Sequence, residues 1–290
     1  MLYVTYTLNF LLMLGMPFLL AAFLARRLGT RWGLVWVGAV TFIASQIVHI
    51  PLLNLLSQLG VLKAAASGWP LVWYATVLGL MAGLCEELAR YLVLRFWLKR
   101  DRSWGSALMF AAGHGGVESV IVGLITASGA ISLFVLSNVD PARLGVTAAQ
   151  LPLLQRQLAA FWGAPVLFPL LGAFERVSAL STHLFLATLV MQTFLRKNLL
   201  WLLAAILWHT LVDALSVYVV ATAGAVPTEI AIAVLALIGL ALMFALRTPE
   251  PLPVPASGNE HLPAGGLTEA QAAQPAPAPT SEQLDRTRYQ

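Results

Sequence analysis

Ionisable side chains recur inside apolar segments of this 290-residue chain, and they are types that transfer protons or bind metal ions. They are Glu86, Glu87 and Arg90 in "GLCEELARYLVLR", His114 and Glu118 in "FAAGHGGVES", Glu175, Arg176 and His183 in "ERVSALSTH", and His209 and Asp213 in "LWHTLVD". An ionisable group at bilayer depth costs roughly 3 kcal/mol or more, so each one needs a partner or a function. Carboxylates and imidazoles together could activate water or hold a metal ion.

Three pairs within this set share one spacing. Glu86 and Arg90, His114 and Glu118, and His209 and Asp213 are each four residues apart. Residues four apart lie on the same face of an α-helix. Each of these segments is therefore expected to turn a polar face towards the interior of a helical bundle.

The composition is that of an integral membrane protein. Hydrophobic residues make up 59% of the chain and charged residues 10%, and the mean hydropathy is +0.81. The formal net charge of +4 comes mainly from short basic clusters between apolar runs, so a nucleic-acid partner is not expected. The single cysteine, Cys85, excludes an internal disulfide framework and a zinc cluster built from cysteines. Membrane lipids are the expected surroundings.

Seven apolar stretches are long enough to cross a bilayer as tilted helices. They lie near residues 4–25, 32–56, 70–94, 103–135, 159–195, 199–221 and 226–246. Pro165 and Pro169 predict a short broken or interfacial helix before the fifth span proper. The fold class predicted is therefore an all-α, polytopic membrane protein with about seven transmembrane helices and a buried polar site.

The chain divides into two regions by composition. Residues 1–247 are expected to form the transmembrane helical domain, with the polar motifs between residues 79 and 215. Residues 248–290 are rich in proline, alanine and polar residues, a composition that predicts a disordered tail.

Basic residues in the short loops predict the orientation. Ten lie on one side, namely Arg26, Arg27, Arg31, Arg95, Lys99, Arg100, Arg102, Arg196, Lys197 and Arg247, and three lie on the other, namely Lys63, Arg143 and Arg156. The side with more basic residues is expected to face the cytosol. This places the N-terminus outside and the C-terminus in the cytosol.

Helix geometry predicts that the acidic and histidine side chains share one layer. Counted at 1.5 Å per residue from each cytosolic end, Glu87 lies roughly 12 Å deep, His209 roughly 15 Å, His114 roughly 16 Å and His183 roughly 18 Å. Scattered histidines would have no reason to share a depth on four helices. We therefore expect one buried cluster slightly to the cytosolic side of the midplane.

Two groups fall outside this layer by the same count. His49 lies roughly 25 Å from the cytosolic end of its span, towards the outer side. Glu175 and Arg176 lie roughly 30 Å deep, near the outer boundary, where a snorkelling or structural role is expected.

The chemistry of the cluster leaves alternatives open. A glutamate could act as the general base, and a histidine could hold the attacking water or donate to a developing oxyanion. Glu86 and Arg90 are expected to pair, whereas Glu87 points about 100 degrees away on the helix. The sequence does not decide which glutamate faces the histidines. A purely structural ion pair at Glu86 and a packing role for His183 are the alternatives.

The polar motifs resemble a known group of proteins. "EELAR", "FAAGH" and "HTLVD" resemble the glutamate pair, the FxxxH motif and the HxxxN/D motif of the CAAX-protease and bacteriocin-processing superfamily of intramembrane proteases. The order "EELARY", "HGGVES", "ERVSALSTH" and "HTLVDA" is similar to the YhfC branch, which is also related to PrsW-type proteases. The resemblance extends from Gly79 to Leu215 and implies a multi-pass protein of a cell inner membrane.

This resemblance implies an endopeptidase that cuts a membrane-embedded or juxtamembrane peptide bond. Carried over by position, the base is Glu86 or Glu87, the assisting histidines are His114 and His209, and Asp213 stands where an oxyanion is held. The YhfC-like pattern adds His183 and Glu118 as site members, with Arg90 and Glu175 in structural or orienting roles.

This sequence departs from the superfamily pattern at two places. Only Leu88 and Ala89 separate the second glutamate from the arginine, where the superfamily pattern has three residues. Asp213 stands where many members have asparagine, and an ionised Asp213 would repel an oxyanion, so it must be protonated, orient His209 or bind a cation.

A divalent metal such as zinc is the cofactor that the resemblance leaves open. The helical zinc motif HExxH is absent, but His114, His183 and His209 with Glu86 or Glu87 could form a tetrahedral site. Of the two mechanisms, the metal-free glutamic one is preferred.

Two other classes of protein could carry the same residues. A proton-coupled or ion-coupled transporter also uses intramembrane acids and histidines. A non-catalytic scaffold could retain the protease fold. The number of acidic and histidine positions present favours the protease, acting on a membrane-associated protein or peptide.

Overall fold

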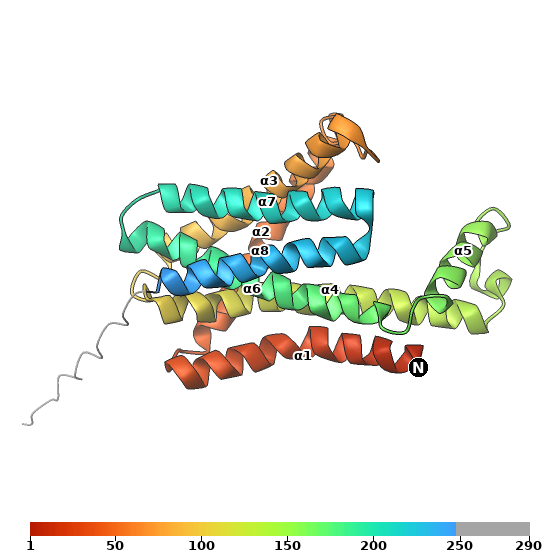
Figure 1. The fold of residues 1–290 in the computed structure, drawn as a ribbon, viewed down its shortest axis with the longest axis horizontal. Coiled ribbons are helices and arrows are strands. Elements are labelled where there is room, and N and C mark those ends of the chain that lie inside the picture. The colour runs from red at the N-terminus through yellow and green to blue at the C-terminus, as the bar shows by residue number, and fades with distance from the viewer. Residues whose placement is uncertain (248–290) are drawn as a thin grey trace, which may run out of the picture. The chain divides into compact units, whose positions relative to one another are not determined.

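The computed structural model describes residues 1–247, and within this part of the chain all regular structure is helical (Figure 1). The elements are α1 (Leu2–Leu28), α2 (Gly33–Gln58), α3 (Gly68–Phe96), α4 (Trp104–Asn138), η1 (Pro141–Leu144), α5 (Leu151–Trp162), η2 (Phe168–Leu170), α6 (Leu171–Leu195), α7 (Leu200–Ala223) and α8 (Ala225–Ala245). The tail predicted for residues 248–290 lies outside the described residues.

The predicted all-α membrane architecture is confirmed. Six of the described helices are long and apolar enough to cross a membrane, namely α1, α2, α4, α7, α8 and the continuous stretch Phe168–Leu195. The remaining long helix, α3, has 29 residues but carries Glu86, Glu87, Arg90 and Arg95 in its second half. These four charged side chains distinguish α3 from the other six stretches. Side chains of the neighbouring helices must compensate them.

Two glycines bring the acidic pair of α3 against α7. A Cβ atom added at Gly79 would lie 2.6 Å from the carbonyl oxygen of Thr210, and one at Gly83 would lie 2.8 Å from the carbonyl oxygen of Ile206. Only a residue without a side chain allows two helix backbones to approach this closely. Because Glu86 and Glu87 lie three and four residues after Gly83, within one helical turn, this packing sets Glu87 beside His209 of α7.

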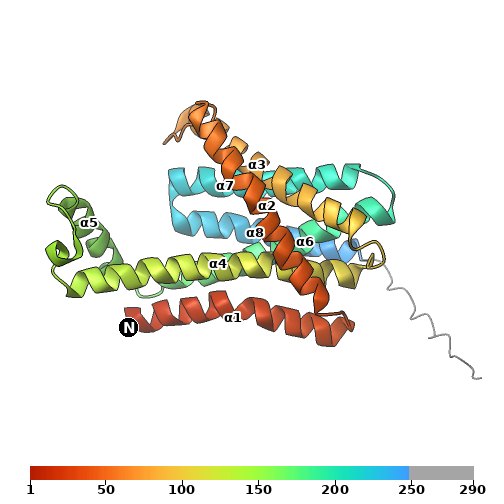
Figure 2. The same ribbon diagram turned by 180° about the vertical axis from the view of Figure 1, so that it is seen from behind.

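A second pair of glycines sets the crossing of α2 over α4. A Cβ atom at Gly38 would overlap the Phe110 carbonyl, and one at Gly113 would overlap the Val35 backbone. Figure 2 shows α2 running diagonally across α4. The second half of α2 therefore diverges from α4 beyond the crossing.

Gly113→Ala is expected to lower the free energy of unfolding by about 1–3 kcal/mol, because the new methyl group must push α2 away from α4. Gly129→Ala in the same helix is the matched control, since a Cβ atom there meets nothing within 4 Å. Thermal unfolding in detergent measures both variants. A midpoint for Gly113→Ala at or above that of Gly129→Ala would show that the two backbones do not meet here.

Candidate active site

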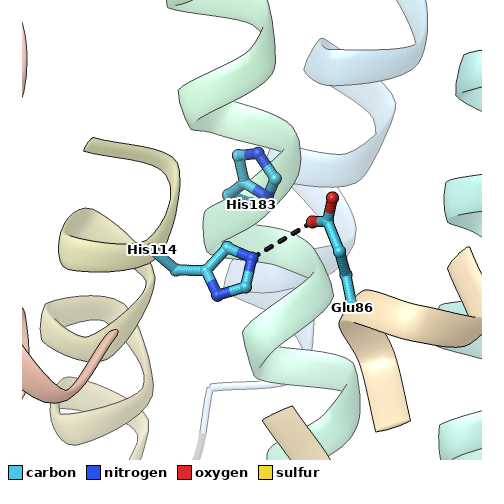
Figure 3. A group of neighbouring side chains, drawn as sticks. All are labelled: Glu86, His114 and His183. Atoms are coloured by element: carbon cyan, nitrogen blue, oxygen red, sulfur yellow. Dashed lines mark hydrogen bonds and ion pairs between the residues drawn. The ribbon is translucent and has the colours of Figure 1, made fainter. Parts of the chain in front are cut away.

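Glu86, His114 and His183 converge from α3, α4 and α6, as Figure 3 shows. The Nε2 atom of His114 lies 3.1 Å from Oε2 of Glu86. One nitrogen or oxygen from each of the three residues lies within 4.8 Å of those of the other two, and all three residues are buried. Residues from three separate helices thus form a group with the geometry of a metal site.

Glu87 lies behind this group and is fully buried. Its Oε1 atom accepts a hydrogen bond from Nη1 of Arg90 at 2.6 Å and lies 2.7 Å from Nδ1 of His209. The distance from Arg90 Nη2 to Glu86 Oε2 is longer, at 3.5 Å. The expected pairing of Glu86 with Arg90 is therefore present, but Glu87, three residues before Arg90, lies closer to the guanidinium.

His209 has both ring nitrogens engaged on the α7 side of the site. Its Nδ1 faces Glu87, and its Nε2 lies 3.5 Å from Oδ2 of Asp213. A carboxylate only accepts hydrogen bonds, and Glu87 lies closer to the ring than Asp213 does, so a neutral His209 ring carries its single proton on Nδ1. Its Nε2 is then the basic nitrogen. Among the described residues, the group that could hold a metal ion consists of Glu86, His114 and His183 and does not include His209. The prediction of His209 as a third histidine ligand is not supported by this arrangement.

His183 is held at both nitrogens. Its Nδ1 lies 2.7 Å from Nη2 of Arg90, and its Nε2 lies 2.5 Å from Oε2 of Glu118. Arginine only donates hydrogen bonds, so Nδ1 of His183 accepts and Nε2 donates to Glu118. This bond fixes the ring so that its Nδ1 lone pair faces Arg90 and Glu86.

Glu118 connects the site to the ion pair at the start of α6. Its Oε1 atom accepts a hydrogen bond from Nη1 of Arg176 at 2.8 Å, and Arg176 also pairs with Glu175. Arg176 is buried and faces inward. Of the two roles expected for Arg176, snorkelling or structural, the structure supports the structural one, because its side chain extends to Glu118 instead of to a membrane surface.

A cavity of about 330 Å³ adjoins these residues. Glu86, His183 and His209 line it, together with Glu118 and Asp213. Glu87 and His114 do not line it. Of the two glutamates, Glu86 is thus the one that a molecule in the cavity can reach, and Glu87 acts through Arg90 and His209.

Gln46 of α2 is a site residue that the sequence analysis missed. Its Nε2 donates to Oε1 of Glu86 at 3.1 Å, and its Oε1 lies 3.1 Å from Nδ1 of His49. His49 lines the cavity, although its residue count placed it outside the layer. His49 can line the cavity without lying in the layer of Glu87, His114, His183 and His209, because the cavity extends from that layer along the helices. The signal that could have found both is two polar side chains three residues apart in an apolar span.

The residues present fit a divalent metal ion. One carboxylate and two imidazoles are a donor set found in catalytic zinc sites. Histidines that bind metals usually donate their other ring N–H to a carboxylate or carbonyl, as His183 does to Glu118. A metal ion at these donors would replace the Nη2 atom of Arg90, which lies 2.7 Å from Nδ1 of His183 and 3.5 Å from Oε2 of Glu86.

Gln46→Leu is expected to weaken the affinity for a divalent metal by about 10–100-fold, because it removes the hydrogen bond that orients Glu86. A competition titration with a chelating dye measures the change. Gln58→Leu, at the exposed end of the same helix, is the control and is expected to leave the affinity unchanged. Equal affinities for the two variants would show that Gln46 does not orient a metal ligand.

The chain matches known proteins over most of its length. The YhfC intramembrane metalloprotease family matches residues 11–236. The uncharacterized membrane protein YhfC of Bacillus subtilis (strain 168) is 32% identical over 206 residues, which cover 68% of this chain and 76% of that protein. No solved structure gives a significant match. The matched range contains all four polar motifs, and the chain belongs to the YhfC intramembrane metalloprotease family.

Proposed function

We propose that this protein is an intramembrane metallo-endopeptidase that hydrolyses a peptide bond in a membrane-embedded or juxtamembrane segment. The observation that carries the proposal is the group of Glu86, His114 and His183, buried within membrane-spanning helices and adjoining a cavity. The family to which the chain belongs supports the same activity.

Glu86, His114 and His183 would hold the divalent ion, and zinc suits this donor set. When bound, such an ion supplies a water molecule that is acidic enough to attack near neutral pH, and a positive charge that polarises the scissile carbonyl. Glu118 and Gln46 keep His183 and Glu86 in place through their hydrogen bonds.

His209 is the proposed general base. The Glu87 carboxylate holds the proton on Nδ1, so Nε2 can accept the proton of the attacking water from the cavity side. Asp213, 3.5 Å from Nε2, then stabilises the positively charged ring. This role suits an ionised Asp213 better than holding an oxyanion, which it would repel.

A metal-free glutamic mechanism would use the same residues with Glu86 as the base. The close approach of two imidazoles to Glu86 favours the metal mechanism over this alternative, which was the one preferred from the sequence.

The placement of the family within the CAAX-protease and PrsW superfamily stays a prediction. The inner-membrane location with the N-terminus outside also stays a prediction.

Mapping new peptide N-termini in a bacterial host tests the function. Membranes that contain the wild-type protein are expected to yield N-termini within or beside membrane spans that are absent with Glu86→Gln. A peptide that spans one of these sites then serves as the substrate for kinetics. Identical sets of N-termini for the two proteins, both folded and in the membrane, would contradict the proposal.

A further inference from the structure

The cavity extends from the site in one direction only. On α2 and α7, the lining residues with the lowest numbers are His49 and His209. On α3 and α6, the lining residues with the highest numbers are Glu86 and His183. Helices α4 and α8 contribute Glu118 and Ile232. Since α2, α4 and α7 run away from the basic loops and α3, α6 and α8 run towards them, all of these limits place the cavity on the same side of the metal-site group. That side is the end of the bundle at residues 58 and 68, away from the ten basic loop residues.

Tightly packed apolar side chains fill the other direction. Met109 and Phe110 of α4 and Phe185, Leu186 and Val190 of α6 lie between the site and the basic loops, and each is at most 2% exposed. Side chains packed at this density leave no space for a peptide or a file of water molecules. Among the described residues, the basic end of the bundle is therefore closed below the site.

The exposed fraction is larger for the carboxylate side chains that lie farther from the basic loops. The side chain of Asp213 is 38% exposed, that of Glu175 is 26% and that of Glu118 is 20%, whereas that of Glu86 is 7% and that of Glu87 is 0%. The carboxylates farther from the basic loops are therefore less enclosed by protein than Glu86 of the metal-site group.

The divergence of α2 from α4 explains why the bundle opens at this end. The two helices touch closely at Gly38 and Gly113, on the basic side of the site. Beyond this crossing α2 runs away from α4 (Figure 2), and the cavity lies beside Glu118 and His49 in the space that the divergence leaves.

We infer that the site is entered from the end of the bundle opposite the basic loops. The substrates would then be peptide segments at that surface of the membrane, which is the outer surface if the basic loops face the cytosol. The identity of these segments as substrates rests on the proposed function, whereas the direction of entry rests on the cavity alone. Tails and loops on the side of the basic loops are excluded as substrates by this geometry.

Cysteine labelling in oriented membrane vesicles tests the direction of entry. In a Cys85→Ser background, Ser216→Cys places a thiol in the cavity wall, and Ser178→Cys places a second, more buried one there. Ser57→Cys and Arg100→Cys put exposed thiols at the two ends of the bundle and report the orientation of the vesicles. The probe is a charged, membrane-impermeant maleimide.

The Ser216→Cys thiol is expected to react at least about tenfold faster from the side that labels Ser57→Cys than from the side that labels Arg100→Cys. Ser178→Cys is expected to show the same preference at a lower rate. Faster labelling from the Arg100→Cys side, or no labelling of either cavity thiol in a folded protein whose end thiols react, would overturn the inference.

This experiment separates the inference from the proposed function. Labelling requires no hydrolysis, so it can succeed while the comparison with Glu86→Gln finds no cleavage. Conversely, cleavage sites mapped to the surface that labels Arg100→Cys would overturn the direction of entry and leave the protease activity in place.

Discussion

Replacing Glu87 with glutamine is expected to lower the free energy of unfolding by about 3–5 kcal/mol. Arg90 is fully buried, and its shortest ion pair, at 2.6 Å, is with Glu87. Removing one partner of a buried pair leaves the other charge uncompensated in a low-dielectric interior, which costs more than the pair contributes. Glutamine can still accept a hydrogen bond but cannot neutralise the guanidinium. Chemical or thermal unfolding in detergent measures the loss.

Asp101→Asn is the control for this substitution. Asp101 also pairs with an arginine, but that partner, Arg31, has a side chain that is 73% exposed. Pairs at the surface contribute about 0–1 kcal/mol, so only a small change is expected. Similar losses for the two variants, or no loss for Glu87→Gln, would show that Glu87 does not compensate a buried charge.

Replacing His209 with glutamine is expected to slow hydrolysis of a mapped substrate peptide by about 10²–10⁴-fold while the bound metal is retained. His209 lines the cavity and is held by Glu87, but it stands outside the group of Glu86, His114 and His183. Its loss therefore removes the proton acceptor and leaves the three proposed ligands in place. Single-turnover kinetics and metal analysis of the same sample measure both quantities.

His114→Ala is the matched comparison, because it removes a buried histidine that is a proposed ligand. That variant is expected to lose both the metal and the activity. Loss of the metal in His209→Gln would show that His209 is a metal ligand. Full activity in His209→Gln would show that His209 is not the general base.

The convergence of the motifs was predictable because helix geometry is regular. Residues four apart share a helix face, and a constant rise per residue places Glu87, His114, His183 and His209 at one depth. The structure brings these four residues together with Glu86 and Glu118. The helices themselves were predictable from apolar length, and the break before α6 follows a segment that contains Pro165.

The roles of the two glutamates were not predictable from spacing. They are adjacent in sequence, and which one faces the cavity depends on how α3 rotates when Gly79 and Gly83 pack on α7. Helix spacing alone allowed Arg90 to pair with either glutamate. The structure directs Glu86 to the cavity and pairs Arg90 most closely with Glu87.

Depth counted along the chain could not show which side chains outside the layer reach the site. The count placed His49 and Arg176 towards the outer side. His49 lines the cavity that extends in that direction, and Arg176 extends its side chain to Glu118. Residue count gives a position along a helix axis, whereas contacts depend on side-chain length and on the space between helices.

The metal content of the purified protein tests the central claim most directly. The full-length wild-type chain, purified in detergent without chelators and measured by elemental mass spectrometry, is expected to hold about one divalent ion per chain. His114→Ala, shown to be folded, is expected to hold less than about a tenth of that amount. An equal metal content in the two proteins, or an active wild-type protein that holds no divalent metal, would contradict the account.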